Sequence, residues 1–110
     1  MGDMVRVEVE EHEDRCLIRL HGEVDMSNAP AVWSKMIGAI SDSVSAVTVD
    51  LSPTRYLDSS GVRLLFQLAD LLGARRRDLI LVIPEDAPIR HALELTGLPS
   101  VARVLSVADD

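Results

Sequence analysis

The stretch of sequence that decides the fold covers residues 46 to 62 and reads Ala46-Val47-Thr48-Val49-Asp50-Leu51-Ser52-Pro53-Thr54-Arg55-Tyr56-Leu57-Asp58-Ser59-Ser60-Gly61-Val62. Its first six residues form an almost unbroken β-prone run, which is typical of a parallel strand buried on both faces. Pro53 to Leu57 is predicted to be a loop. Asp58 to Gly61 is predicted to open a helix, because Asp and Ser side chains accept hydrogen bonds from the first N–H groups of a helix.

The chain after this stretch repeats the same alternation of helix and strand. The helix that opens at Asp58 is predicted to end near Leu72, where Gly73 can take the left-handed position that follows many helices. The next apolar run, Leu79 to Ile83, predicts another buried strand, which Pro84 closes. A strand, a helix and a second strand therefore follow one another, as in a parallel sheet.

A third helix and a short strand are predicted for the C-terminal part of the chain. Asp86 can cap this helix, Pro88 fits its first turn, and Gly97 ends it. Val101 to Val107 can supply one more short strand.

The N-terminal part of the chain has the two-residue period of strands with one wet face. Apolar and charged residues alternate over Val5 to Glu10 and again over Arg15 to His21. The acidic residues from Glu10 to Asp14 are predicted to form the turn between them. We therefore expect an antiparallel hairpin at one edge of the sheet.

A first helix is predicted to follow this hairpin. Ser27 or Asn28 can cap it, with Pro30 in its first turn. One face of this helix is apolar and carries Val32, Trp33, Met36, Ile37 and Ile40. The complete element order predicts an α/β fold with a mixed, mainly parallel sheet of four to five strands and helices that cross between strands.

Composition excludes several classes of function. The chain has 110 residues, 47% of them hydrophobic, a net charge of −7 and one cysteine, Cys16. It is long enough for one domain with its own core, and it cannot form an internal disulfide. Cys16 occupies a core-facing position and is expected to be buried and inert. We expect no nucleic-acid partner, because an acidic chain repels phosphate backbones.

The distribution of apolar residues predicts a cytoplasmic, soluble protein with no direct membrane insertion. The longest strongly apolar run is Leu79 to Ile83, far short of the ~18 residues that a spanning helix needs. The N-terminus lacks the order of basic and apolar residues that marks a signal peptide.

Helical geometry separates the residues of the second helix into two faces. At 100° per residue, a core face is predicted for Val62, Leu65, Phe66, Ala69 and Leu72. The opposite face is predicted for Ser60, Arg63, Leu64, Gln67 and Leu71. Ser60, rather than Ser59, should therefore present its hydroxyl outward. The outer leucines are either covered by a neighbouring loop or helix of this chain or form a partner-binding surface.

The two serines at the helix start have two alternative roles. They can simply cap the helix, or Ser60 can carry a phosphate, which free N–H groups and the helix dipole would stabilise at that point. A phosphate would add roughly −1.5 to −2 charge and would eject an acidic or apolar partner surface.

Three motifs, in order, resemble those of the STAS-domain family of anti-anti-sigma factors. Val47 to Ser52 followed by Tyr56 to Val62 resembles the buried strand ending Asp-Leu-Ser and the helix start Asp-Ser-Ser-Gly of that family. Gly22 to Asp25 is similar to its Gly-Glu-Leu-Asp motif, and Ala92 to Leu98 to its late Leu-Thr-Gly-Leu helix end. The resemblance implies a single STAS domain over residues 1–110.

The resemblance implies a switch protein, an anti-sigma factor antagonist. Members of the family bind an anti-sigma factor, usually a serine kinase, and thereby free the sigma factor for transcription. The kinase phosphorylates the second serine of the motif, here Ser60, and a metal-dependent serine/threonine phosphatase resets the protein. The phosphorylation site and partner face are then expected to include Asp25, Asp50, Asp58, Ser59, Gly61, Arg63, Leu64 and Gln67.

Other roles are open within the same family. STAS domains also serve as accessory subunits of lipid ABC transporters and as regulatory domains of anion transporters. The family commonly has a last helix, whereas this sequence stops too soon for one, at Ala108-Asp109-Asp110. The resemblance therefore gives no expectation for the oligomeric state.

The sequence favours a binding module over an enzyme. His12, His21 and His91 could be combined with Ser60 into a Ser-His-Asp arrangement, but the Gly-x-Ser-x-Gly turn is missing. No histidine pair has the spacing of His-Glu-x-x-His, and no glycine-rich phosphate loop occurs. We therefore expect no catalysis, no metal and no cofactor. The basic run Arg75 to Arg77 is expected to be a solvated turn.

Overall fold

The computed structural model describes residues 5–107 and contains six strands, three α-helices and a 3₁₀ helix. In chain order these are β1 (Val5–His12), β2 (Arg15–Val24), α1 (Ala29–Ala39), β3 (Ala46–Asp50), β4 (Thr54–Leu57), α2 (Ser59–Ala74), β5 (Asp78–Val82), α3 (Pro88–Leu95), η1 (Leu98–Ser100) and β6 (Arg103–Leu105). The predicted order of elements is confirmed, with one strand more than expected.

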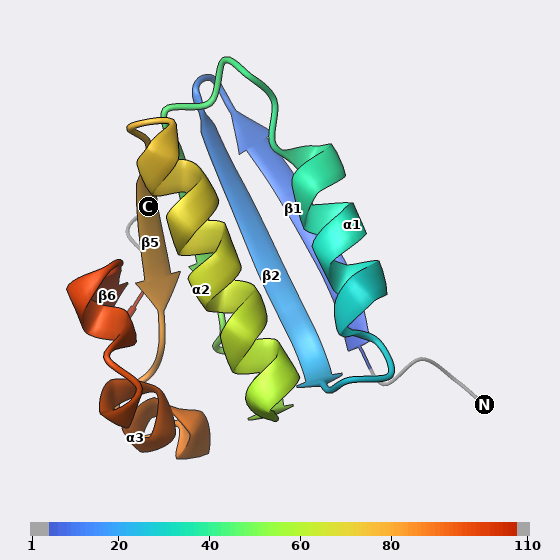
Figure 1. Ribbon diagram of the computed structural model, residues 1–110, viewed down its shortest axis with the longest axis vertical. Helices are drawn as coiled ribbons and strands as arrows, with labels where there is room; N and C mark the ends of the chain where they lie inside the picture. Colours follow the sequence, from blue (N-terminus) through green and yellow to red (C-terminus); the bar gives the residue numbers. More distant parts are fainter. Residues whose placement is uncertain (1–4, 108–110) are drawn as a thin grey trace.

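The strands form a single mixed sheet in the order β1-β2-β3-β5-β6, and β4 pairs with the end of β2. Figure 1 shows β1 and β2 side by side. Only β1 and β2 run antiparallel, with Val7 opposite Leu20. The other pairs are parallel, and Ile18 lies opposite Val49 in the central pair. The predicted N-terminal hairpin at a sheet edge and the mainly parallel sheet are both confirmed.

Strand β4 lies where the sequence predicts a loop. Its pairing with β2 begins at Gly22 and Thr54 and is interrupted by an irregularity of register at Gly22, whose φ is 99°. Thr54 is buried, and its hydroxyl donates to the Leu20 carbonyl at 2.6 Å. The loop prediction was wrong because this strand depends on bonds to β2 rather than on a local apolar pattern.

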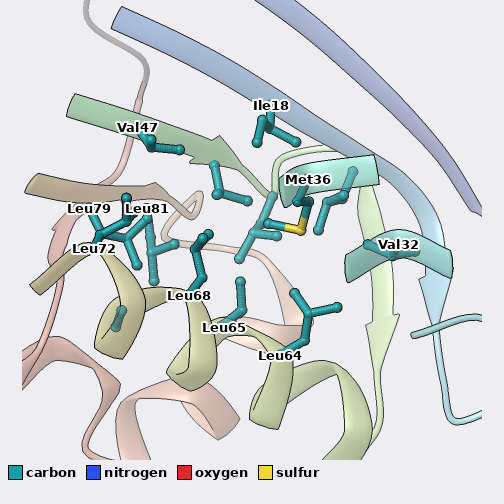
Figure 2. Packing of buried hydrophobic residues seen from close by; sticks show 14 of the residues in the cluster. Ile18, Val32, Met36, Val47, Leu64, Leu65, Leu68, Leu72, Leu79 and Leu81 are labelled. Carbon is teal, nitrogen blue, oxygen red and sulfur yellow. The ribbon is translucent and has the colours of Figure 1, made fainter. Parts of the chain in front are cut away.

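Helices α1 and α2 lie side by side on one face of the sheet (Figure 1). Between them and the strands lies the core, in which Ile18, Val47 and Leu81 of the sheet meet Met36 of α1 and Leu68 of α2 (Figure 2). These five side chains are almost fully buried. Burial of this apolar surface is the main term that holds the two helices against the sheet.

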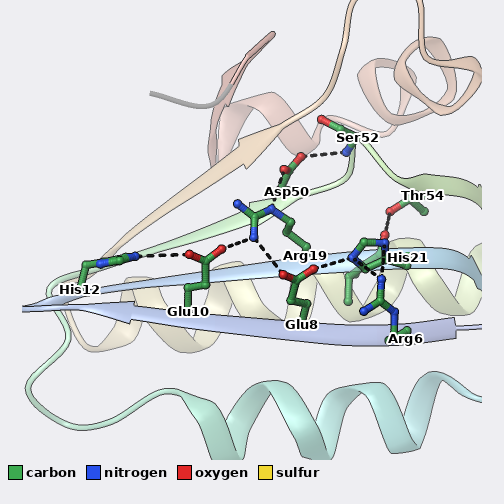
Figure 3. A network of polar contacts seen from close by, with 10 residues as sticks. Arg6, Glu8, Glu10, His12, Arg19, His21, Asp50, Ser52 and Thr54 are labelled. Carbon is green, nitrogen blue, oxygen red and sulfur yellow. Dashed lines mark hydrogen bonds and ion pairs between the residues drawn. The ribbon is translucent and has the colours of Figure 1, made fainter. Parts of the chain in front are cut away.

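Within residues 5–107, no helix covers the other face of the sheet, which is largely polar. Glu8, Glu10 and Asp50 surround the guanidinium of Arg19 there, and His21 contacts Glu8 (Figure 3). Strand β3 was predicted to be buried on both faces, which is wrong, because alternate residues such as Thr48 remain partly exposed on this side. A sheet with helices on only one face leaves the other face wet.

The hairpin turn is shorter than its acidic composition suggests. Glu10 to Asp14 was predicted as the turn, but β1 continues to His12 and only Glu13 and Asp14 connect the strands. Glu13 has a positive φ of 57°. Acidic side chains remain in the strand because Arg19 and other cross-strand partners neutralise them.

The N-termini of α1 and α3 lack the side-chain caps that were predicted. Asn28 is the N-cap residue of α1, but its side chain makes no capping bond to that helix. Ala87, rather than Asp86, is the N-cap residue of α3. Both helices carry proline in the first turn, as expected, where its missing N–H needs no partner.

Helix α2 ends two residues later than predicted. Gly73 is still helical, and Arg76 takes the left-handed position with a φ of 56°. The Arg77 N–H donates to the Leu72 carbonyl at 2.8 Å and the Arg76 N–H to the Gly73 carbonyl at 3.0 Å. These two bonds close a Schellman motif, which satisfies the last carbonyls of the helix without glycine in the left-handed position.

Two further side chains bear on the sequence predictions. Cys16 is buried, as expected, and burial raises the pKa of its thiol. Arg77 is not simply part of a solvated turn, because its guanidinium donates to the Ser41 carbonyl at 3.0 Å and to the Asp42 carbonyl. Within residues 5–107, no helix has the length and apolar character needed to cross a membrane.

Candidate functional site

Asp58 organises the N-terminus of α2. Its backbone is extended, and its Oδ1 atom accepts hydrogen bonds from the N–H groups of Ser60 at 2.8 Å and Gly61 at 3.1 Å. The Val62 N–H donates to the Asp58 carbonyl at 3.0 Å. The helix therefore begins at Ser59 because Asp58 satisfies N–H groups that have no partner within the helix.

The same carboxylate joins the start of α2 to the loop between β2 and α1. The Oδ2 atom of Asp58 accepts from the Met26 N–H at 3.1 Å, and the Asp58 N–H donates to the Val24 carbonyl at 3.1 Å. Two segments more than 30 residues apart in the sequence are thus held together by one side chain and its backbone.

The loop itself is shaped by Asp25 and Asn28. The Oδ1 atom of Asp25 accepts from the Ser27 N–H at 2.9 Å and from the Ser27 hydroxyl, and these bonds lower the pKa of Asp25. The Asn28 Oδ1 atom accepts from the Asp25 N–H at 2.9 Å, and its amide donates to the Glu23 carbonyl. Asp25 therefore acts on the site by ordering the loop beside α2.

Gly61 permits close contact between the start of α2 and the ends of two strands. A Cβ atom at this position would lie 2.9 Å from Leu57 Cδ2 and 3.3 Å from the Val24 carbonyl oxygen. The first of these distances is shorter than normal van der Waals contact. Any side chain at residue 61 would therefore push the helix start away from the sheet.

The two serines differ in exposure, but not as predicted. Ser59 is exposed, whereas Ser60 is half-buried. The prediction that Ser60 is the outward serine and Ser59 is not was therefore wrong in its ranking, because Ser59 is the more exposed of the two. The reason is that the loop after β2 and the first turn of α1 lie against α2, and an isolated helix cannot reveal such a neighbour.

Ser60 lies at the edge of a shallow cavity between α1 and α2, which we call the α1–α2 groove. The groove has a volume of about 230 Å³ and is lined by Met26, Ala29, Pro30, Trp33, Ser60, Arg63, Leu64 and Gln67. Met26 is 75% exposed, so the rim of the groove offers an apolar side chain to a partner. Sequence analysis had placed Trp33 on an apolar helix face but had no signal that α1 contributes to the site.

Leu64 is not an exposed apolar residue on the surface of α2. It is only 2% exposed and belongs to the core beneath α1 and α2 (Figure 2). Of the two alternatives for this residue, coverage by a neighbouring helix is confirmed. By contrast, Arg63 and Gln67 are exposed, as predicted, and flank the groove.

Asp50 is not in contact with this site. By strand alternation its side chain lies on the helix-free face, opposite to Val49. There it pairs with Arg19 Nε at 3.5 Å and accepts from the Ser52 N–H at 2.9 Å (Figure 3). The expectation that Asp50 shapes the surroundings of Ser60 is wrong, because its contacts order the β3–β4 connection instead.

Among residues 5–107, neither His12 nor His21 contacts Ser60. His12 and His21 contact Glu10 and Glu8 on the helix-free face, away from Ser60. In the same part of the chain, no three His, Cys, Asp or Glu side chains are grouped so that they could hold a metal ion. The features that remain are a hydroxyl, a capped helix start and an adjoining groove.

Proteins of known structure share this fold over most of their own length. A crystal structure of an anti-sigma factor antagonist from Mycobacterium paratuberculosis has a TM-score of 0.84 and 29% identity, and the match covers 96% of this chain and 89% of that chain. The unphosphorylated form of the anti-sigma factor antagonist SpoIIAA has a TM-score of 0.73 and 25% identity over 90% of this chain and 87% of that chain. The STAS fold is thereby confirmed.

A domain of the murine anion transporter Slc26a9 also has this fold. Its TM-score is 0.73, but the identity is 15% and the match covers 90% of this chain and only 17% of the transporter. This likeness concerns the fold alone.

Sequence comparison agrees with the structural likeness. The anti-sigma-F factor antagonist RsfB of Mycobacterium tuberculosis is 25% identical over 108 residues, which is 98% of this chain and 87% of RsfB. The family model for the STAS domain matches residues 6–108. Because that match extends over almost the whole sequence, the chain belongs to the STAS domain family.

Proposed function

We propose that this protein is an anti-sigma factor antagonist that binds an anti-sigma factor with serine kinase activity and so releases the sigma factor. The observation that carries the proposal is the position of Ser60, at the first turn of α2 and on the edge of the α1–α2 groove. It is supported by the names of the relatives that match most of this chain, which are anti-sigma factor antagonists. In this account the protein binds and has no catalysis of its own.

Phosphorylation of Ser60 is the proposed off-switch. The N–H groups of Ser60 and Gly61 are already bound to Asp58, so a phosphate at Ser60 would not find them free. It would carry roughly −1.5 to −2 charge beside the Asp58 carboxylate and next to the apolar side chains of Met26 and Trp33. The cost of desolvating the phosphate would then expel an apolar partner surface from the groove.

A metal-dependent serine/threonine phosphatase is the second proposed partner, because a switch of this kind needs a reset. The relative SpoIIAA supports the covalent step, since its structure is known in a phosphorylated as well as an unphosphorylated form. The alternative function, a regulatory subunit of a transporter, is less well supported, because the likeness to Slc26a9 rests on 15% identity.

The test is phosphorylation by the cognate anti-sigma kinase. The protein is incubated with the kinase and ATP, and its intact mass is measured. We expect the mass of one added phosphate in the parent and in Ser59→Ala, and no addition in Ser60→Ala. Modification of Ser60→Ala to the same extent as the parent would assign the phosphate to another residue and refute the proposal.

A further inference from the structure

A second hollow lies on the helix-free face of the sheet, and we call it the sheet-face hollow. It has a volume of about 340 Å³, within the range of small-ligand sites. Leu17, Thr48, Ile80 and Arg103 lie opposite one another on β2, β3, β5 and β6 and form a row across it. In-register neighbours on adjacent strands point to the same face, so this row forms a continuous surface.

The floor of the hollow is apolar. Val82 and Leu105, which pair with each other on β5 and β6, continue the surface next to Ile80. Val82 is 1% exposed although it lies on the face that no helix covers. Val82 is therefore already covered by the protein itself, whereas Leu17, Ile80 and Leu105 are partly exposed and would lose contact with water beneath an apolar molecule.

The rim of the hollow is cationic, in contrast to the chain as a whole. It carries Arg15 and Arg103 against one carboxylate, Asp78, whereas the complete chain has a net charge of −7. Within residues 5–107, neither Arg15 nor Arg103 forms an ion pair. By contrast, Arg19 on the same face is surrounded by three carboxylates (Figure 3).

We propose that the sheet-face hollow binds a free medium-chain carboxylate. The alkyl chain lies on Leu17, Ile80 and Leu105, and the carboxylate pairs with the guanidinium groups of Arg15 and Arg103. An apolar floor with a cationic rim fits such an amphipathic anion, because burial of the chain and charge pairing are satisfied together. The hollow faces away from α1 and α2, so it can be filled while the α1–α2 groove is occupied.

The test is an NMR titration of the ¹⁵N-labelled 110-residue protein with sodium decanoate, kept below its micellar concentration. We expect saturable shifts of the amide signals of Leu17, Thr48 and Ile80. The double variant Arg15→Gln, Arg103→Gln should bind about tenfold more weakly, since charge-assisted hydrogen bonds are lost. The control with the same net charge, Arg55→Gln, Arg75→Gln, should bind like the parent, and decan-1-ol should bind more weakly than decanoate.

Several results would overturn the proposal. One is the absence of shifts at these amides, and another is shifts centred on Met26 and Ser60 instead. A third is equal weakening in both double variants, which would mean that net charge alone attracts the anion. The fourth is a change of the Leu17 and Ile80 signals with protein concentration in the absence of decanoate, which would assign the face to a second copy of the chain. Binding to anionic vesicles without binding of free decanoate would likewise exclude a free carboxylate.

Discussion

On the helix-covered face of the sheet, Ile18 and Val49 are fully buried beneath α1 and α2, whereas their chain neighbours Arg19 and Thr48 stay partly exposed on the other face. The first face is held by burial of apolar surface, which is lost whenever a large side chain is removed. The second is held by ion pairs that solvent screens. The comparison teaches that the stability of the fold depends mainly on the helix-covered face. The charged side chains of the helix-free face are therefore available to bind a ligand.

The largest effect is expected for Leu64→Asp, on the buried face. A carboxylate would be placed in the core between α1 and α2, so we expect destabilisation by more than about 4 kcal/mol. Urea unfolding measures it, with Gln67→Asp, an exposed position on the same helix, as the control. Equal stability of the two variants would mean that Leu64 is a surface residue after all.

Asp58→Ala tests whether the Asp58 cap orders the N-terminus of α2 and the loop that contains Met26. It removes two capping bonds of α2 and the bond to the Met26 N–H, and we expect a loss of about 1–2 kcal/mol. Amide exchange of Met26 should accelerate at the same time. Asp70→Ala, an exposed carboxylate on α2, should change stability little. If both variants lose the same stability, the cap is not what orders this site.

Gly73→Ala is expected to stabilise the protein by about 0.5–1 kcal/mol. Gly73 is helical, and a Cβ atom there meets no atom within 4 Å among the described residues, so alanine lowers only the entropy of the unfolded chain. Thermal unfolding measures the gain. A loss of stability would mean that Gly73, and not Arg76, holds the left-handed position after α2.

Arg19→Gln, on the helix-free face, should have the smallest effect at neutral pH, below that of Asp58→Ala. The hydrogen bond from Arg19 lowers the pKa of Glu10 from its ordinary value of 4.5. The stabilisation from this pair is therefore present above pH 4.5 and is lost as the pH falls through the lowered pKa. The urea midpoint of the parent should consequently fall more steeply in acid than that of the variant. Parallel pH profiles would argue against this coupling.

The features that were predictable from the sequence have local causes. The position of strand β3 follows from the β-prone run at residues 46–50. The capped start of α2 follows from Asp58, whose side chain bonds to its own helix. Each of these two features depends on a few neighbouring residues. The resemblance to the family motifs then predicted the fold of the rest of the chain.

The features that were missed depend on partners distant in the sequence. Strand β4 forms because Thr54 reaches the Leu20 carbonyl, and Leu64 is buried because α1 covers it. Strand alternation places Asp50 on the helix-free face, where its ion-pair partner is Arg19 of a different strand. None of these pairs leaves a periodic or local signal in the sequence.

The central claim is that phosphorylation of Ser60 controls partner binding. It is tested most directly by calorimetric titration of this protein with the cognate anti-sigma factor. The parent, its kinase-phosphorylated form and Ser60→Asp are compared, with Ser59→Asp as the control one residue away. We expect the phosphorylated form and Ser60→Asp to bind at least about tenfold more weakly than the parent, or ~1.4 kcal/mol, and Ser59→Asp to bind more tightly than Ser60→Asp. Equal affinities of the phosphorylated and unphosphorylated protein would contradict the account.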